Sequence, residues 1–178
     1  MKRSMPTRDC FPSSVTIAIT GLLLLTGCTG KAIEEIQLET KSKAEAAQAA
    51  RIQAQAVADL ASKPLDRWTT STAPCIGIRG EMPADGRWNL AGFANISVPA
   101  DEQIDILARI RNMWEQRGYE IIIDQTLSNE QGGVLSTRDP KSGITMTISA
   151  SKDGERLALT VATPCYLPIP GEDPANDF

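Results

Sequence analysis

The composition of residues 31–62 and the spacing of their apolar residues predict a helix, which follows an apolar N-terminal stretch. Residues 31–62 contain no Gly or Pro and are rich in Ala, Gln, Glu and Lys, which are strong helix formers. The helix should end before Pro64, because the residue that precedes a proline avoids the α region. We expect its apolar stripe to consist of Ala49, Ile52, Ala56, Val57 and Leu60.

Two alternatives remain open for the first half of this helix. Residues 28–45 form either a tether or the start of the helix. A coiled coil would have a seam through Ile33, Ile36, Ala47, Ala50, Ala54 and Val57. Thr40 and Lys43 would also fall in that seam, which disfavours this arrangement.

A second helix is predicted over residues 101–117. The acidic pair Asp101-Glu102 suits a helix N-terminus, where the macrodipole favours anions, and Gly118 suits the C-terminal cap. The expected core stripe is Ile106, Leu107, Ile110, Met113 and Trp114.

Period-two alternation predicts strands on both sides of this second helix. Over residues 88–98, one face carries Trp88, Leu90, Ala94, Ile96 and Val98. Phe93 breaks the alternation, and Gly92 beside it indicates a bulge. Four further strands are expected at 119–126, 134–138, 144–149 and 157–163, the last two joined by a hairpin at residues 152–155. Residues 63–75 are expected to be a lead-in loop, and residues 76–79 a short strand.

The order of these elements predicts an α+β fold. We expect an antiparallel sheet of about five strands with two helices packed on one face, as a single domain over residues 46–166. Residues 167–178 contain Pro168, Pro170 and Pro174 together with acidic residues, so we expect a disordered tail.

The apolar stretch before the domain predicts a secretory signal peptide over residues 1–27. Lys2, Arg3 and Arg8 form a basic start, and the apolar run from Val15 to Leu25 has about eleven residues. That length fits a signal h-region and falls short of the roughly 20 residues of a membrane-spanning helix. The alternatives are an ordinary secreted protein with a chance cysteine, or a short membrane anchor. Met5 is an alternative start that would discard two of the basic residues.

Leu25-Thr26-Gly27-Cys28 ends the apolar run as a lipobox. Cleavage before Cys28 would expose a thiol for a diacylglycerol thioether, and its amine would be open to a third chain such as palmitate. Several acyl chains on one residue give effectively permanent attachment. We therefore expect the protein at the cell membrane, lipid-anchored on the extracytoplasmic face.

The number of cysteines left after cleavage is consistent with an oxidising compartment. After cleavage, Cys28, Cys75 and Cys165 remain. Lipidation uses the first, and the other two form an even pair, which favours a disulfide. The alternative is two buried free thiols.

Charge disfavours a nucleic-acid partner. The full chain has 18 Lys and Arg and 22 Asp and Glu; residues 1–27 hold three of the former and one of the latter. The mature chain therefore has 15 basic and 21 acidic residues, a formal net charge of −6. Nucleic-acid binding needs clustered positive charge.

The sequence offers no recognisable catalytic machinery. It contains no histidine, which removes histidine-dependent triads and histidine metal sites. The S-x-x-K pattern from Ser149 to Lys152 and the Lys141-Ser142-Gly143 box occur in the wrong order for a penicillin-binding enzyme, and on a hairpin rather than a helix. We therefore expect no catalytic residue, no metal site and no cofactor.

Several sequence features, taken together, are similar to those of a known group of proteins. They are the lipobox Leu25–Cys28, the Ala-rich helix, Trp68 followed by Pro74-Cys75, Trp114 with Gly118-Tyr119, and Pro164-Cys165-Tyr166. With these features the chain resembles the small uncharacterised lipoproteins of actinobacteria. The resemblance covers most of the mature chain and implies a Cys75–Cys165 disulfide and an envelope location.

The expected function is that of a non-catalytic binding or interaction module in the bacterial envelope. Its partner would be an unknown envelope protein or small ligand. The alternatives are a small-ligand carrier with a groove between sheet and helices, and an envelope enzyme. Trp88, Trp114 and Tyr119 are candidates to line such a groove, although aromatic residues on the apolar faces of a strand and a helix are more often core residues.

Overall fold

The computed structural model describes residues 38–77, 79–126, 133–150 and 154–176. The predicted signal peptide and Cys28 lie outside the described residues. Among the residues that are described, no helix is both long enough and apolar enough to cross a membrane.

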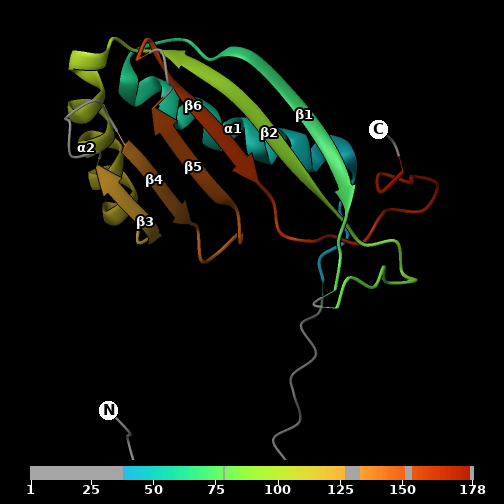
Figure 1. The fold of residues 1–178 in the computed structure, drawn as a ribbon. Coiled ribbons are helices and arrows are strands. Elements are labelled where there is room, and N and C mark those ends of the chain that lie inside the picture. Colours follow the sequence, from blue (N-terminus) through green and yellow to red (C-terminus); the bar gives the residue numbers. More distant parts are fainter. Residues whose placement is uncertain (1–37, 78, 127–132, 151–153, 177–178) are drawn as a thin grey trace, which may run out of the picture. The chain divides into compact units, whose positions relative to one another are not determined.

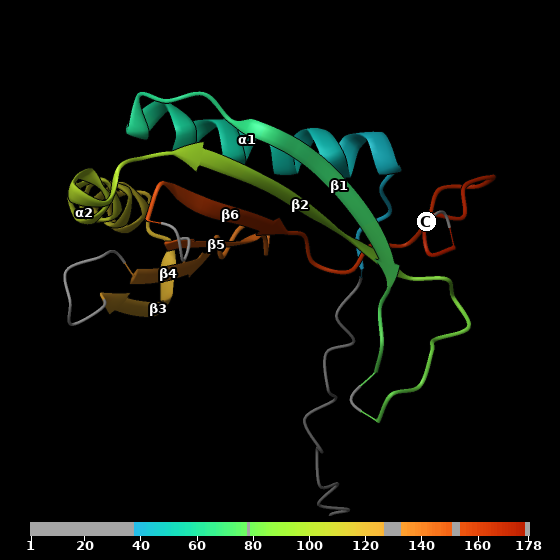
Figure 2. The same ribbon diagram turned by 45° about the horizontal axis from the view of Figure 1, so that its top comes forward.

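The described residues form a six-stranded antiparallel sheet with two helices on one of its faces (Figure 1; Figure 2). In chain order the elements are α1 (Lys43–Ala61), β1 (Asp66–Pro74), β2 (Trp88–Ser97), α2 (Ala100–Gln116), β3 (Glu120–Thr126), β4 (Gly133–Arg138), β5 (Thr145–Ala150) and β6 (Arg156–Ala162). The order across the sheet is β1-β2-β6-β5-β4-β3, with every neighbouring pair antiparallel. The predicted α+β class is confirmed, with six strands in place of about five.

The additional strand is β1, which lies in the region predicted to be a lead-in loop. Its residues from Thr69 to Pro74 pair in unbroken register with β2. A loop is predicted there from Pro64, Trp68 and Pro74 together with the run of hydroxyl residues at 69–72. Threonine is β-branched and fits a half-exposed strand, so this composition suits an edge of the sheet. The short strand predicted at residues 76–79 is wrong for its described part, because Ile76, Gly77 and Arg79 belong to no strand.

Helix α1 begins later than the sequence predicts. Ser42 caps it in a capping box with Glu45, and the residues from Leu38 to Ser42 are not helical. Ser42 Oγ accepts a hydrogen bond from the Glu45 backbone N–H at 3.2 Å. The helix ends at Ser62, which adopts the left-handed conformation with φ 53°.

The buried stripe of α1 also differs from the prediction. It consists of Ala46, Ala50, Ala54, Val57, Ala58 and Ala61. Ile52, which was expected in the stripe, is 59% exposed. Small alanine side chains allow the helix to approach the sheet closely, where large side chains of β2 such as Trp88 and Leu90 occupy the space. Because this stripe packs on its own domain, the described part of the helix does not form the alternative coiled coil.

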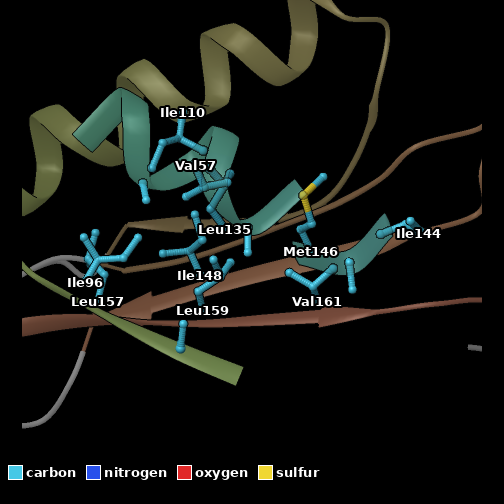
Figure 3. Close-up of a cluster of buried hydrophobic side chains, with 14 of the residues drawn as sticks. Val57, Ile96, Ile110, Leu135, Ile144, Met146, Ile148, Leu157, Leu159 and Val161 are labelled. Atoms are coloured by element: carbon cyan, nitrogen blue, oxygen red, sulfur yellow. The ribbon is translucent and has the colours of Figure 1, made fainter. Parts of the chain in front are cut away.

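Helix α2 and the alternation of β2 follow the prediction closely. Ile106, Leu107, Ile110 and Trp114 are buried and Met113 is partly buried. All five apolar residues predicted for the inner face of 88–98 are buried. Together with Leu135, Ile144, Met146, Ile148, Leu157, Leu159 and Val161 they form one core between helices and sheet (Figure 3).

The segment after Tyr166 was predicted to be disordered, and its described part differs from that prediction. The Leu167 backbone pairs with the residues just before α1: its N–H donates to Glu39 O at 2.9 Å, and its carbonyl accepts from the Lys41 N–H at 3.0 Å. Farther along, Pro174 and Ala175 are buried. Proline prevents a helix or central strand but does not prevent packing, which explains the difference.

Candidate functional site

The sheet face opposite the helices is a candidate surface for binding. Of the described elements, both helices lie on the other face (Figure 2). We call the uncovered side the open face. Its positions alternate with the core positions along each strand, as the pleat requires.

A row of aligned residues crosses the open face from β1 to β3. Strand register places Thr69 opposite Phe93, Phe93 opposite Thr160, Thr160 opposite Thr147, Thr147 opposite Ser136, and Ser136 opposite Ile123. We call these six residues the hydroxyl row. Because neighbouring strands are about 4.8 Å apart, Phe93 and Ile123 are separated by about 19 Å across four strand spacings.

The side chains of the hydroxyl row carry no formal charge. The Ser136 and Thr147 hydroxyl oxygens are 2.9 Å apart and share a hydrogen bond. Phe93 is 43% exposed, and Ile123 is also exposed. The next residue of β4 on the same face is Arg138, whose charge is paired with Glu120 at 2.6 Å. Thr147 and Thr160 are half-buried, whereas Ser136 is only 3% exposed. The surface therefore presents threonine hydroxyl groups in the middle and one apolar side chain of the row toward each side of the sheet.

Phe93 points onto the open face without a bulge in its own strand. The register of β2 with β6 is continuous, and the irregularity lies in β1 between Asp66 and Thr69. The bulge predicted at Gly92 is therefore wrong. Gly92 serves a different purpose, because a Cβ at this position would overlap the ring of Trp68. Absence of that Cβ makes room for the Trp68 ring against β2.

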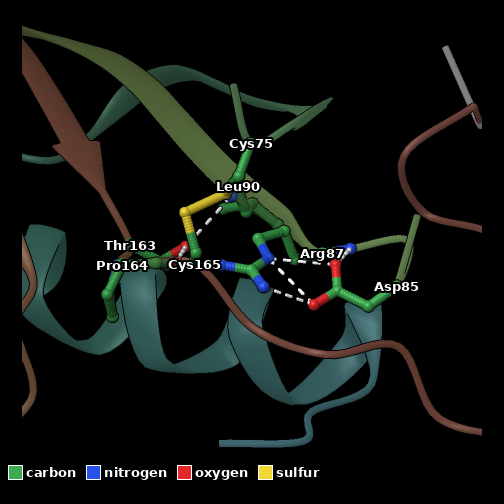
Figure 4. The surroundings of a disulfide bond; sticks show 7 residues. All are labelled: Cys75, Asp85, Arg87, Leu90, Thr163, Pro164 and Cys165. Carbon is green, nitrogen blue, oxygen red and sulfur yellow. Dashed lines mark hydrogen bonds and ion pairs between the residues drawn. A yellow bond between two sulfur atoms is a disulfide. The ribbon is translucent and has the colours of Figure 1, made fainter. Parts of the chain in front are cut away.

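Two cysteines, one just after β1 and one after β6, meet at one end of the sheet (Figure 4). Cys75 and Cys165 are joined by a disulfide, which confirms the predicted pairing. Nearby, Thr163 Oγ1 accepts a hydrogen bond from the Leu90 N–H at 3.0 Å, and the Thr163 N–H donates to Leu90 O at 2.9 Å. The disulfide therefore fixes the chain after β6 against the end of β1.

An arginine–aspartate pair lies beside the disulfide (Figure 4). Arg87 Nε donates to Asp85 Oδ1 at 2.9 Å. The hydrogen bond from the Arg87 side chain is the main reason that the pKa of Asp85 is lower than usual. Both groups are in partial contact with water, so this pair orders the loop before β2 rather than forming a buried reactive site.

An aromatic cluster occupies the same end of the domain. The rings of Trp88 and Tyr166 meet edge to face at a centroid distance of 6.0 Å, and Lys41 Nζ lies 4.8 Å from the centroid of Tyr166. Burial raises the pKa of Tyr166. Burial alone would lower the pKa of Lys41, but its hydrogen bond to Glu39 and the nearby negative charge raise it overall. These effects keep the phenol neutral and the amine charged at neutral pH.

The three aromatic residues considered for a ligand groove do not line one. Two belong to the core, and the third contacts a side chain of α1. Trp88 and Trp114 are fully buried. Tyr119 is partly buried, and its hydroxyl donates to Gln53 Oε1 at 3.4 Å. A pocket between α2 and the β3–β4 side of the sheet has a volume of about 130 Å³ and is lined in part by Leu107, Arg111 and Asp124. Ligand sites usually enclose about 300–1,000 Å³, so this pocket by itself is small for a carrier. Two more open hollows are larger, one of about 480 Å³ beside Lys43 and Asp173 and one of about 650 Å³ beside Pro99 and Gly154.

The polar turn that resembled a K-[ST]-G box has a structural role. Asp139 is 7% exposed and accepts hydrogen bonds from the Lys141 N–H at 2.9 Å and the Ser142 hydroxyl at 2.7 Å. Burial would raise the pKa of Asp139, but these hydrogen bonds lower it below its usual value. Ser142 is thus engaged in closing the turn between β4 and β5. In the described ranges, no three Asp, Glu or Cys residues lie together in a way that would hold a metal ion.

Comparison of the chain with protein-family models, curated proteins and solved structures gave no match. The functional proposal therefore depends on the residues and their arrangement. The predicted lipidation residue, Cys28, lies outside the described residues, whereas Cys75 and Cys165 are brought together. The hydroxyl row was not anticipated as a site. Its signal in the sequence was the polar half of each alternating strand, which is also typical of any solvated sheet face.

Proposed function

We propose that this protein is an envelope lipoprotein, held at the cell membrane through acylated Cys28, whose folded domain binds a partner without catalysing a reaction. Leu25-Thr26-Gly27-Cys28 carries the first part of this proposal, because a lipobox directly follows a short apolar run and a basic start. The Cys75–Cys165 disulfide supports it, since disulfides persist in oxidising compartments.

The open face is the surface through which we propose that the domain binds. The threonine hydroxyl groups of its hydroxyl row offer donors and acceptors without formal charge, and Phe93 supplies an exposed aromatic contact. Exposed aromatic side chains are frequent anchors at interfaces. A neutral row that extends across six strands of an open sheet face suits a macromolecular partner in the envelope better than a small ligand, because ligand sites are usually concave.

The experiment is site-specific photocrosslinking in intact cells. A photoreactive side chain replaces Phe93 on the open face in one strain, and Ile52 on the exposed side of α1 in another. We expect a discrete crosslinked species from position 93 and none from position 52, because α1 covers the opposite face of the sheet.

A second substitution tests whether the crosslink from position 93 depends on the open face. Thr160→Arg places a long charged side chain directly opposite Phe93 in the register of β2 and β6. We expect it to reduce the crosslink from position 93 at least fivefold while thermal unfolding of the domain is unchanged. Equal crosslinking from positions 52 and 93, or a yield insensitive to Thr160→Arg, would contradict binding through the open face.

A further inference from the structure

The loop from Cys75 to Arg87 presents two large apolar side chains to solvent. Ile76 is 66% exposed and Met82 is 65% exposed, which makes them the two most exposed large apolar residues in the described part of the chain. Their backbone neighbours pair, because the Gly77 N–H donates to Glu81 O at 2.8 Å. Ile76 and Met82 directly flank this pair, so both side chains belong to the same short segment of the loop.

Internal hydrogen bonds hold the described part of this loop in a defined shape. The Gly80 N–H donates to Gly77 O at 2.9 Å, and the Arg79 N–H donates to a carboxylate oxygen of Glu81 at 2.9 Å. At the base of the loop, the Cys75 N–H donates to Arg87 O at 3.0 Å, beside the disulfide. The exposure of Ile76 and Met82 is therefore a property of an ordered loop.

The loop lies at the end of the domain where the chain enters the fold. Its last part adjoins the segment after the disulfide, since a Cβ at Gly86 would come within 3.6 Å of Pro168. The preceding residue of that segment, Leu167, pairs with Glu39 and Lys41 at the start of the described chain. Figure 2 shows the loop extending from the ends of β1 and β2 nearest to the start of α1.

Chain length restricts how far this end can be from the anchor. Leu38, the first described residue, is ten positions after Cys28. Even a fully extended chain of that length spans at most about 35 Å. Under the proposed lipid anchor, Leu38 therefore stays within about 35 Å of the bilayer, and the end of the domain that carries Ile76 and Met82 is the end where this tether joins.

We infer that the Cys75–Arg87 loop is a second membrane contact, which inserts Ile76 and Met82 into the headgroup region of the bilayer. This inference rests on the proposed lipid anchor at Cys28. Exposed apolar side chains mark membrane or protein contacts, and here the chain that leads to the anchor identifies the lipid surface as the occupant. The acyl chains supply the attachment, and the loop sets the orientation of the domain.

The charges on the loop indicate which lipids matter. Arg79 and Arg87 are balanced by Glu81 and Asp85, so the described loop carries no net formal charge. Electrostatic attraction to anionic lipid is therefore not the driving force, in contrast to a polybasic segment. We expect the contact to form on neutral phosphatidylcholine and to change less than twofold when anionic lipid is added.

The test uses the full protein as its cells produce it, reconstituted into phosphatidylcholine vesicles with and without bromine on the lipid acyl chains. Ile76→Trp places an indole on the loop, and Met82→Trp provides a second probe at the same site. Ile122→Trp on β3 is the matched control, because Ile122 is also an exposed isoleucine (51%) but lies on the strand at the opposite edge of the sheet from β1. Quenching of the native tryptophans, measured in the unchanged protein, is subtracted.

We expect bromolipid to quench either loop tryptophan at least threefold more than Ile122→Trp. Similar quenching at the loop and at position 122, with the protein retained on the vesicles, would overturn the loop contact while leaving the anchor intact. A protein that washes off the vesicles and carries no acyl chain would overturn both proposals. Blue-shifted loop tryptophans without bromolipid quenching would indicate a protein contact in place of lipid and would also overturn the inference.

Discussion

At the scale of single residues, Gly92 shows how one missing side chain determines local packing. The Trp68 ring occupies the position where a Cβ would be, and Arg51 lies over that ring with its guanidinium carbon 5.3 Å from the centroid. Arg67, just before Trp68, has a positive φ of 56° within the irregular part of β1. The strand irregularity and Gly92 together allow the indole to pack between α1 and β2.

Gly92→Ala should lower the free energy of unfolding by about 1–3 kcal/mol, because an added methyl group must displace the Trp68 ring. Denaturant titration measures this change. In a Trp68→Ala background the same substitution should cost much less, since the space is then empty. Equal costs in both backgrounds would show that the ring is not the obstacle.

The lowered pKa of Asp139 predicts that the stability of the domain falls at acid pH. Its pKa in the folded state is below the usual value, whereas the unfolded chain has the ordinary value of about 3.9. The stabilisation is therefore complete above about pH 4 and is lost as the pH falls through the lower, folded-state pKa. Asp139→Asn should be less stable than the unchanged protein at pH 7 by about 1–3 kcal/mol.

The difference in the free energy of unfolding between the unchanged protein and Asp139→Asn should shrink as the pH is lowered from 4.5 to 2.5. Denaturant unfolding at each pH measures it. Ser142→Ala removes the hydroxyl donor to the carboxylate, so the pKa of Asp139 should rise in that variant, which NMR titration would detect. A stability difference that stays constant over this pH range would contradict the assigned role.

At the scale of elements, α2 is tied to the sheet by a buried amide that sequence patterning did not identify. Gln103 lies in the first turns of the helix and is fully buried. Its Nε2 donates to Val98 O at 2.9 Å and to Gly154 O at 3.0 Å. One side chain therefore connects the helix start, the end of β2 and the turn before β6.

Gln103→Leu should lower the free energy of unfolding by about 1–3 kcal/mol, because a side chain of similar size leaves the two carbonyl groups without this donor. Thermal or denaturant unfolding would measure the loss. Gln116→Leu, at an exposed position of the same helix, should change stability by no more than about 0.5 kcal/mol. A comparable loss in both variants would indicate an effect of helix composition and not of the amide contacts.

The element boundaries show what the sequence can and cannot predict. Strand β2 and helix α2 were predicted well because large apolar residues repeat there with one clear period. Strand β1 was missed because it is an edge strand with only Thr72 buried among its residues, so the pattern lacks an apolar face. In α1 the buried stripe consists mainly of alanine, and a prediction that favours large residues selected Ile52 instead.

At the scale of the whole domain, the sequence predicted the fold class and the cysteine pairing but not the sheet order. Strand order depends on long-range pairing, such as β2 with β6, which local patterns do not specify. The same limit applies to the hydroxyl row. Its members come from six strands, and only the register of the finished sheet aligns them.

The disulfide should contribute strongly to stability because it closes a loop between residues 90 positions apart. In the chain-entropy account such a loop contributes about 4 kcal/mol. Cys75→Ala/Cys165→Ala should therefore unfold at a markedly lower denaturant concentration than the unchanged protein. A reductant should destabilise the unchanged protein to a similar extent and have no effect on the double variant. An unchanged midpoint after reduction would contradict this role.

The central claim is that Cys28 carries the membrane anchor, and metabolic labelling with a fatty-acid analogue tests it most directly. The unchanged protein should incorporate the label and sediment with membranes. Cys28→Ala should lose the label, whereas the Cys75→Ala/Cys165→Ala variant should keep it because those cysteines form the disulfide. Persistent labelling of Cys28→Ala, or no labelling of the unchanged protein, would contradict the lipoprotein account.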